Sequence, residues 1–227
     1  MGVDKGLDVG LTKAVKHAGK VPAVGAVLKP IAKGAKIAVD VGRYAGTGLA
    51  VVNTGCALYS GDLRSVYNNV SFARTDILAA KLGFLSTYLG LPMIGSSESP
   101  TIGYASYGHG NMYRGAFVFR GGLVGAVLPP KKWGFTFGHN IFINGSNWSR
   151  TNSYDRSVTM GHGFEHVFQY EKYGAGFFDP YLNRKVPYPF GQSEELQARW
   201  SRSKGRRLEW DAYSWEEDWA PRVEWWF

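Results

Sequence analysis

The sequence predicts an α+β fold in which a helix-rich N-terminal region precedes a unit of short strands and two helices. The first sixty residues are rich in Ala, Gly, Val and Lys, with lysines that recur at helical spacing. Residues 114–120 and 134–144 alternate bulky with small or polar side chains, as strands do. With 227 residues, 44% hydrophobic and 19% charged, the chain is long enough for one sizeable domain or a domain with appended segments.

Residues 1–60 are expected to form a helical segment. Lys29, Lys33 and Lys36 recur at helical spacing and leave apolar residues to the other faces, as in an amphipathic helix. The simpler interpretation is a solvated basic face. The alternative is docking on anionic lipid, so membrane contact through residues 1–60 stays open.

Residues 61–112 are expected to hold an apolar helix and a linker. Thr75 and Asp76 offer an N-cap for a helix from Ile77 to about Leu89, and the Pro, Gly and Ser content of residues 91–101 predicts a loop. Two apolar stretches, 44–59 and 77–94, approach the length of a membrane span, but polar residues interrupt both. We therefore expect buried helices there.

Residues 113–203 are expected to hold the strands and both helices of the second unit. The two strand-like runs precede a helix over about 156–173, for which Asp155 is the expected cap. A second helix should open at Ser193, where two glutamates favour the first turn. The remaining segment, 204–227, is acidic and rich in tryptophan. It is expected to cover its own domain, because an exposed aromatic patch favours aggregation.

Composition excludes several classes of function. The single cysteine, Cys56, excludes an intrachain disulfide framework and any Cys-rich metal site, so a metal must be held by His, Asp and Glu. The net charge of +8 permits an anionic partner. Nucleic acid is not expected, because the basic N-terminal segment lacks tryptophan and the Trp-rich end is acidic. No secretory signal is recognisable, which predicts a cytoplasmic protein or one secreted without such a signal.

One motif carries chemistry. His162 and His166 lie four residues apart on the predicted helix, so both imidazoles project from one face. Glu165 borders that face, which gives the pattern H-x-x-E-H, the inverse of H-E-x-x-H. Such motifs place two nitrogen ligands on Zn²⁺ and a carboxylate that takes a proton from water. A His pair at this spacing also arises by chance on helix surfaces.

A catalytic zinc site needs a third protein ligand. Glu194 and Glu195, at the start of the second helix, are the natural candidates, since an antiparallel helix could bring Glu195 to the His pair. His139, in the second predicted strand, is the competing candidate. It could instead contact substrate.

The order of these motifs resembles a family of small bacterial gluzincin-like metallopeptidase domains. The resemblance covers residues of about 113–200. It rests on a Gly-Gly segment, a strand with Gly-His, a helix with a metal motif, and a Pro-Phe segment before a Glu-x-x-Ala helix. The counterparts here are Gly121-Gly122, TFGHNI at 136–141, HGFEHVFQYEKYGAGFFDPYL at 162–182, Pro189-Phe190 and ELQA at 195–198.

The resemblance implies a zincin-like unit that binds Zn²⁺ through His162, His166 and Glu195 and acts on a peptide or protein substrate. One position departs from the family, because Gly163 stands where the general-base glutamate is expected. Either Glu165 serves as the base, or the domain is a catalytically degenerate metal-binding or interaction protein. The N-terminal region further suggests a bacterial effector or toxin component, with a membrane-active module in residues 1–60 as the alternative.

Overall fold

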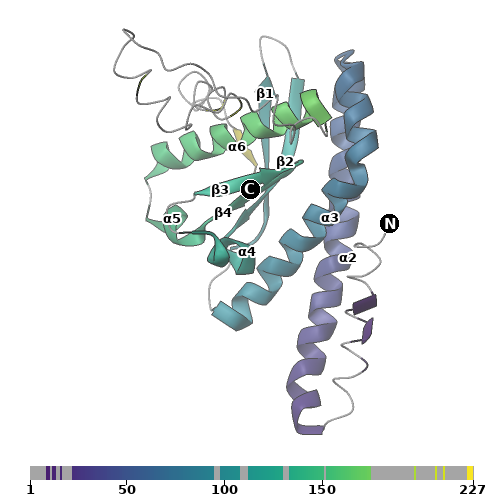
Figure 1. The fold of residues 1–227 in the computed structure, drawn as a ribbon, viewed down its shortest axis with the longest axis vertical. Coiled ribbons are helices and arrows are strands. Elements are labelled where there is room, and N and C mark those ends of the chain that lie inside the picture. The colour runs from purple at the N-terminus through teal and green to yellow at the C-terminus, as the bar shows by residue number, and fades with distance from the viewer. Residues whose placement is uncertain are drawn as a thin grey trace.

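The computed structural model shows an α+β protein: two long N-terminal helices, then a mixed sheet and a helix packed on it (Figure 1). Most of the chain between Pro22 and Gly174 is described, along with a short strand near the C-terminus. In full, the structure describes residues 9–10, 12–13, 16, 22–94, 98–107, 112–129, 133–150, 152–174, 197, 208, 212 and 224–226.

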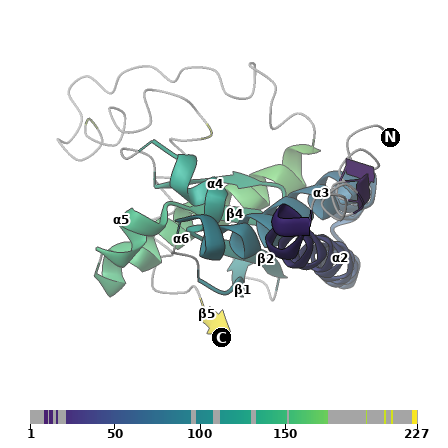
Figure 2. The same cartoon turned by 90° about the horizontal axis from the view of Figure 1, so that it is seen from below.

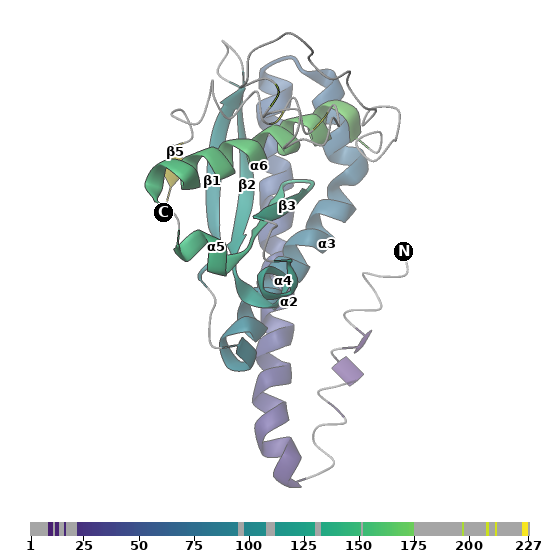
Figure 3. The same cartoon turned by 60° about the vertical axis from the view of Figure 1, so that its left-hand side comes forward.

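The two N-terminal helices form an antiparallel hairpin. Helix α2 spans Pro22–Tyr59 and α3 spans Leu63–Ile94, with a tight turn between them (Figure 3). Asp62 caps α3, because its carboxylate accepts hydrogen bonds from the backbone N–H and the hydroxyl of Ser65. Lys29, Lys33 and Lys36 lie within α2, as the helical spacing predicted.

A five-stranded mixed sheet follows, in the order β3-β4-β2-β1-β5. Its strands are β1 (Thr101–Tyr107), β2 (Met112–Arg120), β3 (Gly134–Phe137), β4 (Asn140–Ile143) and β5 (Glu224–Trp226). The central strand β2 runs antiparallel to β1 and parallel to β4. The short helix α4 (Gly122–Val127) connects β2 to β3, and a second short helix, α5 (Gly145–Ser149), leads from β4 to α6 (Ser153–Tyr173).

Helices cover both faces of the sheet, so side chains that alternate along β2 enter two different cores. Ala116 and Val118 face α6 and join a cluster with Ile141, Phe164 and Val167. Phe117 and Phe119 face the α2–α3 hairpin and join a second cluster with Leu49, Ala80 and Phe142. Figure 2 shows the hairpin on one side of the sheet. The alternation that predicted a strand therefore reflects burial on both faces.

Small residues let the hairpin pack closely against the sheet and within itself. A Cβ added to Gly42 of α2 would lie 2.7 Å from the Cα of Lys81 in α3. Buried Asn53 joins α2 to β2, because its side-chain amide donates to the Gly115 carbonyl and its oxygen accepts from the Gly115 N–H. These contacts fix the position of the sheet relative to both helices.

Two sequence predictions are wrong about caps. Asp76 does not begin a helix, since α3 is continuous from Leu63 and carries Asp76 in its buried interior. Its carboxylate holds His139 instead. Asp155 does not cap α6 either. Asn152 is the cap, accepting from the Asp155 N–H at 2.8 Å, and the helix begins at Ser153.

The strand predicted over 134–144 is a hairpin of two short strands, β3 and β4. The chain turns at Gly138, whose φ of 59° favours glycine. A Cβ there would also collide with the Asp76 carboxylate. The turn exposes the His139 backbone N–H to Asp76, and so brings the strand pair and α3 together.

The second helix predicted from Ser193 lies outside the described residues apart from Gln197. Of the segment 204–227, Leu208 and Ala212 are buried, and β5 pairs with β1 and forms one edge of the sheet. Both apolar stretches noted above lie within α2 and α3. Within the described part of the chain, no helix combines the length and apolar character needed to cross a bilayer.

Candidate metal and catalytic site

Helix α6 carries the sequence motif and presents two different faces. Met160, Phe164 and Val167 lie on the face that packs into the sheet. His162 and His166 lie on the other side of the helix, together with Gln169. This division follows from the helical period, because residues three and four apart share a face.

The structure brings His162 and His166 together as predicted. Their Nε2 atoms lie 3.1 Å apart, with the two rings nearly perpendicular at 84°. A tetrahedral zinc ion with bonds of 2.0–2.1 Å separates two ligand nitrogens by about 3.3 Å. The side-chain arrangement therefore fits two ligands of one Zn²⁺.

Gln169 determines which nitrogen of His166 is available. The Gln169 Nε2 amide donates to the Leu208 carbonyl at 3.0 Å and to Glu165 Oε1 at 3.2 Å. Its Oε1 therefore faces His166, and His166 Nδ1–H donates to it at 2.9 Å. The neutral His166 then carries its lone pair on Nε2, which accepts a hydrogen bond from His162 Nε2–H. A metal bound by the pair would take the place of that proton, with Gln169 holding the His166 ring.

Glu165 lies next to the pair and is only 8% exposed. The Gln169 amide holds its carboxylate on the same side of α6. Gly163 faces the opposite way, since a Cβ there would lie 3.1 Å from two side-chain carbons of Ile141 in β4. A glutamate at position 163 would thus meet the sheet, and the available carboxylate beside the histidines is at 165.

No third ligand lies among the described residues, where no group of three or more His, Cys, Asp or Glu side chains is placed to hold a metal. The candidates Glu194 and Glu195 lie outside the described part of the chain. The competing candidate His139 is not brought to the pair. Both of its ring nitrogens lie 2.9 Å from carboxylates, those of Asp76 and Glu171.

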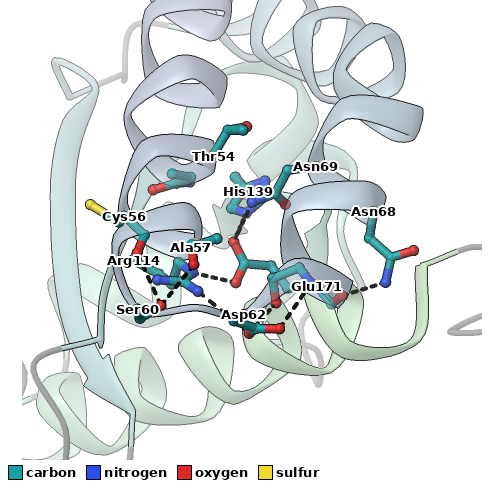
Figure 4. A network of polar contacts seen from close by, with 12 residues as sticks. Thr54, Cys56, Ala57, Ser60, Asp62, Asn68, Asn69, Arg114, His139 and Glu171 are labelled. Atoms are coloured by element: carbon teal, nitrogen blue, oxygen red, sulfur yellow. Dashed lines mark hydrogen bonds and ion pairs between the residues drawn. The ribbon is translucent and has the colours of Figure 1, made fainter.

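His139 instead forms the centre of a buried polar network that the sequence did not predict (Figure 4). Glu171 Oε1 also accepts from the Asn69 amide, and its other oxygen pairs with the Arg114 Nε. Arg114 continues to the Asp62 carboxylate at 3.7 Å. The network joins α3 and the turn before it to the sheet and to α6. Its side chains are almost fully buried except that of Asp62, which is 32% exposed.

Charge complementarity holds this network together. Burial alone would lower the pKa of His139, but the charges and hydrogen bonds of Asp76 and Glu171 more than offset it and raise that pKa to about 10. Burial likewise disfavours the Glu171 carboxylate, whereas hydrogen bonding to His139 and the charges of His139 and Arg114 lower its pKa. At neutral pH a cationic imidazole therefore lies between two carboxylates.

The network predicts a pH-dependent stability. The raised pKa of His139 contributes stability that is full below about pH 6.5 and is lost as the pH rises toward about 10. The lowered pKa of Glu171 contributes stability above its ordinary 4.5 that is lost on further acidification. Urea unfolding of a His139→Leu variant should lack the wild-type decline between pH 6.5 and 10. An identical alkaline decline in both proteins would contradict this assignment.

A cavity of about 430 Å³ lies between α6, the start of α3 and β2. It lies between the His162–His166 site and the His139 network. Glu165 and Gln169, beside the histidine pair, line one part of its wall, and Arg114 and Glu171, from the network, line another. Phe168 adds an aromatic surface, and Arg64 and Lys172 add positive charge. The cavity can hold a polar group of a ligand directly beside the Glu165 carboxylate.

Comparisons with protein-family models, with curated proteins and with solved structures find no match to this chain.

Proposed function

We propose that this protein is a zinc-dependent hydrolase of peptide or protein substrates, with His162 and His166 as zinc ligands and Glu165 as the general base. The observation that carries the proposal is the 3.1 Å approach of the two Nε2 atoms, combined with the Gln169 hydrogen bond to Nδ1 that places the His166 lone pair on Nε2.

The third ligand is assigned to Glu195, with Glu194 as the alternative. This assignment depends on the sequence resemblance to the zincin-like family, whose third ligand follows on the next helix. A glutamate completes a two-His-one-Glu set and leaves one position open for water, as hydrolytic zinc sites require.

When bound, zinc supplies a Lewis acid that lowers the pKa of a water molecule to near 7. Glu165 then accepts the proton, for which it is suited by its position beside the histidines and its low exposure of 8%. The Gln169 amide orients the Glu165 carboxylate through its hydrogen bond to Oε1. Gln169 therefore positions both a ligand and the base.

The cavity beside Glu165 supports a peptide substrate. Its wall combines the Phe168 ring with charged groups of both signs, including Arg64 and Asp62. Such a mixed surface can accept a side chain and the polar backbone of an extended peptide. The bacterial effector or toxin role follows from the sequence resemblance alone, and it remains a secondary part of this proposal.

Glu165→Gln is the variant that tests the reaction. We expect zinc-loaded wild type to hydrolyse a fluorogenic casein substrate, and chelation to abolish that activity. Glu165→Gln should retain zinc but lose about 10²–10⁴-fold in rate, because general-base catalysis is removed. Glu98→Gln is the matched control, since Glu98 is half-exposed and pairs with Arg120 away from α6.

Two outcomes contradict the proposal. Equal hydrolysis by wild type and Glu165→Gln would exclude Glu165 as the base. No hydrolysis by either protein when zinc is bound would exclude the enzyme and leave a metal-binding protein without this catalytic activity.

A further inference from the structure

Helix α2 exposes a continuous apolar stripe on the side opposite its contacts with α3. Its large members are 44–73% exposed, although they lie on a helix of 38 residues that packs against the domain along its other face. The stripe consists of Ile37, Val41, Tyr44, Gly48, Val51, Gly55 and Leu58. Contiguous exposed apolar surface of this kind marks a binding face.

The spacing of the stripe is that of a helix–helix seam. Its members follow one another by four and three residues in strict alternation, from Ile37 to Leu58. This is the heptad pattern in which apolar residues keep facing a second helix. The stripe is about 32 Å long at 1.5 Å per residue. Its length and period both fit a second long helix.

We propose that α2 pairs in antiparallel orientation with α2 of a second copy of this chain. With the pair centred between Gly48 and Val51, Tyr44 of one copy lies opposite the partner's Gly55, and Gly48 lies opposite the partner's Val51. Val41 then meets the partner's Leu58. At Gly48 and Gly55 a large side chain thus faces a glycine, which allows close packing there, and Val41 and Leu58 make an apolar contact toward the ends.

The two glycines have room for these side chains. A Cβ added at Gly48 or Gly55 would meet no atom within 4 Å, whereas Gly42 and Gly46 on the opposite face are closed by α3. Packing within one chain therefore does not require glycine at positions 48 and 55. The close approach of a partner's side chain to the helix would explain glycine at both positions.

Charge favours a second copy over a lipid surface. No Lys or Arg lies between Tyr44 and Tyr59, so most of the stripe lacks the basic flank that an anionic membrane needs. The same segment carries no Asp or Glu either, so no like charges oppose each other across this part of the seam.

Sedimentation equilibrium of the full chain tests the pair. We expect a dimer of twice 25.1 kDa at micromolar concentration. Tyr44→Glu and Val51→Glu should each raise the dissociation constant at least 100-fold, because a charge enters the seam. Val127→Glu is the matched control, since Val127 is 79% exposed on α4, away from the stripe. It should leave the dimer intact.

Gly55→Leu separates folding from pairing. Leucine favours a helix more than glycine and meets open space in the single chain, so thermal stability at monomeric concentration should be equal or higher. The dimer should nevertheless weaken at least 10-fold, because the partner's Tyr44 loses its space. A Gly55→Leu protein that dimerises as well as wild type would overturn the proposed packing.

Cysteine crosslinking tests the orientation in a Cys56→Ser background. Val41→Cys with Leu58→Cys should crosslink under oxidation, whereas Val41→Cys alone should not, because the two Val41 positions lie about 26 Å apart along the antiparallel seam. Efficient crosslinking by the single variant would overturn the antiparallel pair. A monomer at all concentrations would overturn the proposal. Flotation of a monomeric wild type with phosphatidylglycerol vesicles would also overturn the proposal, if Val51→Glu abolishes that flotation. The stripe would then bind a membrane and not a second copy.

Discussion

Replacing His139 by leucine is expected to lower the free energy of unfolding by about 3–5 kcal/mol, the cost of leaving buried charges without a partner. His139 is 2% exposed and lies between the carboxylates of Asp76 and Glu171 at 2.9 Å from each. Leucine keeps an apolar volume but removes the cation. The measurement is urea unfolding at pH 6 with a chelator present, so that zinc does not contribute to stability.

A double substitution distinguishes lost charge from lost packing. Adding Glu171→Gln to His139→Leu removes one of the two carboxylates that lose the imidazolium, so the double variant should lose less than the sum of its two single substitutions. Strict additivity, or a His139→Leu protein within about 1 kcal/mol of wild type, would contradict a network held by charge.

His162→Ala and His166→Ala are expected to lower zinc affinity by more than 100-fold each, because each removes a ligand from the pair. Gln169→Leu should have a smaller effect, about 10–100-fold, since it removes the hydrogen bond that orients His166 but leaves both histidines in place. Competition with a chromophoric zinc chelator measures all three. His109→Ala, to which the sequence assigns no role, serves as the control.

The order of the zinc affinities, with the two alanine variants weakest and Gln169→Leu intermediate, tests both the ligands and the hydrogen bond that orients His166. If Gln169→Leu bound zinc as tightly as wild type, the hydrogen bond from His166 Nδ1–H would have no part in metal binding. If the two alanine variants bound zinc like wild type, the pair would be a feature of the helix surface.

The sequence predicted the elements whose signals are local. The α6 helix, the strand β2 and the approach of His162 to His166 follow from residues that are neighbours along the chain. Gly163 was recognised as a departure, but only the packing of Ile141 against it shows why a side chain is disfavoured there.

The polar network was missed because its contacts join distant residues. Asp76 follows Thr75 in a pattern typical of a helix start, yet its partner His139 lies 63 residues away. The one sequence feature that pointed to the network was Gly138 followed by His139 within an apolar run. In the structure Gly138 has a positive φ and makes the turn that carries His139. The stripe on α2 has a heptad period that is visible in the sequence. Helix α2 has two apolar faces, however, and only the structure shows which one packs against the domain.

Zinc K-edge X-ray absorption of the purified full chain tests the central claim most directly, because it identifies the atoms bound to the metal. We predict one zinc per chain with two imidazole nitrogens at about 2.0–2.1 Å, and loss of that imidazole signal in the His162→Ala, His166→Ala double variant. Protein that retains no zinc, or an unchanged spectrum in the double variant, would contradict the assignment of His162 and His166 as ligands.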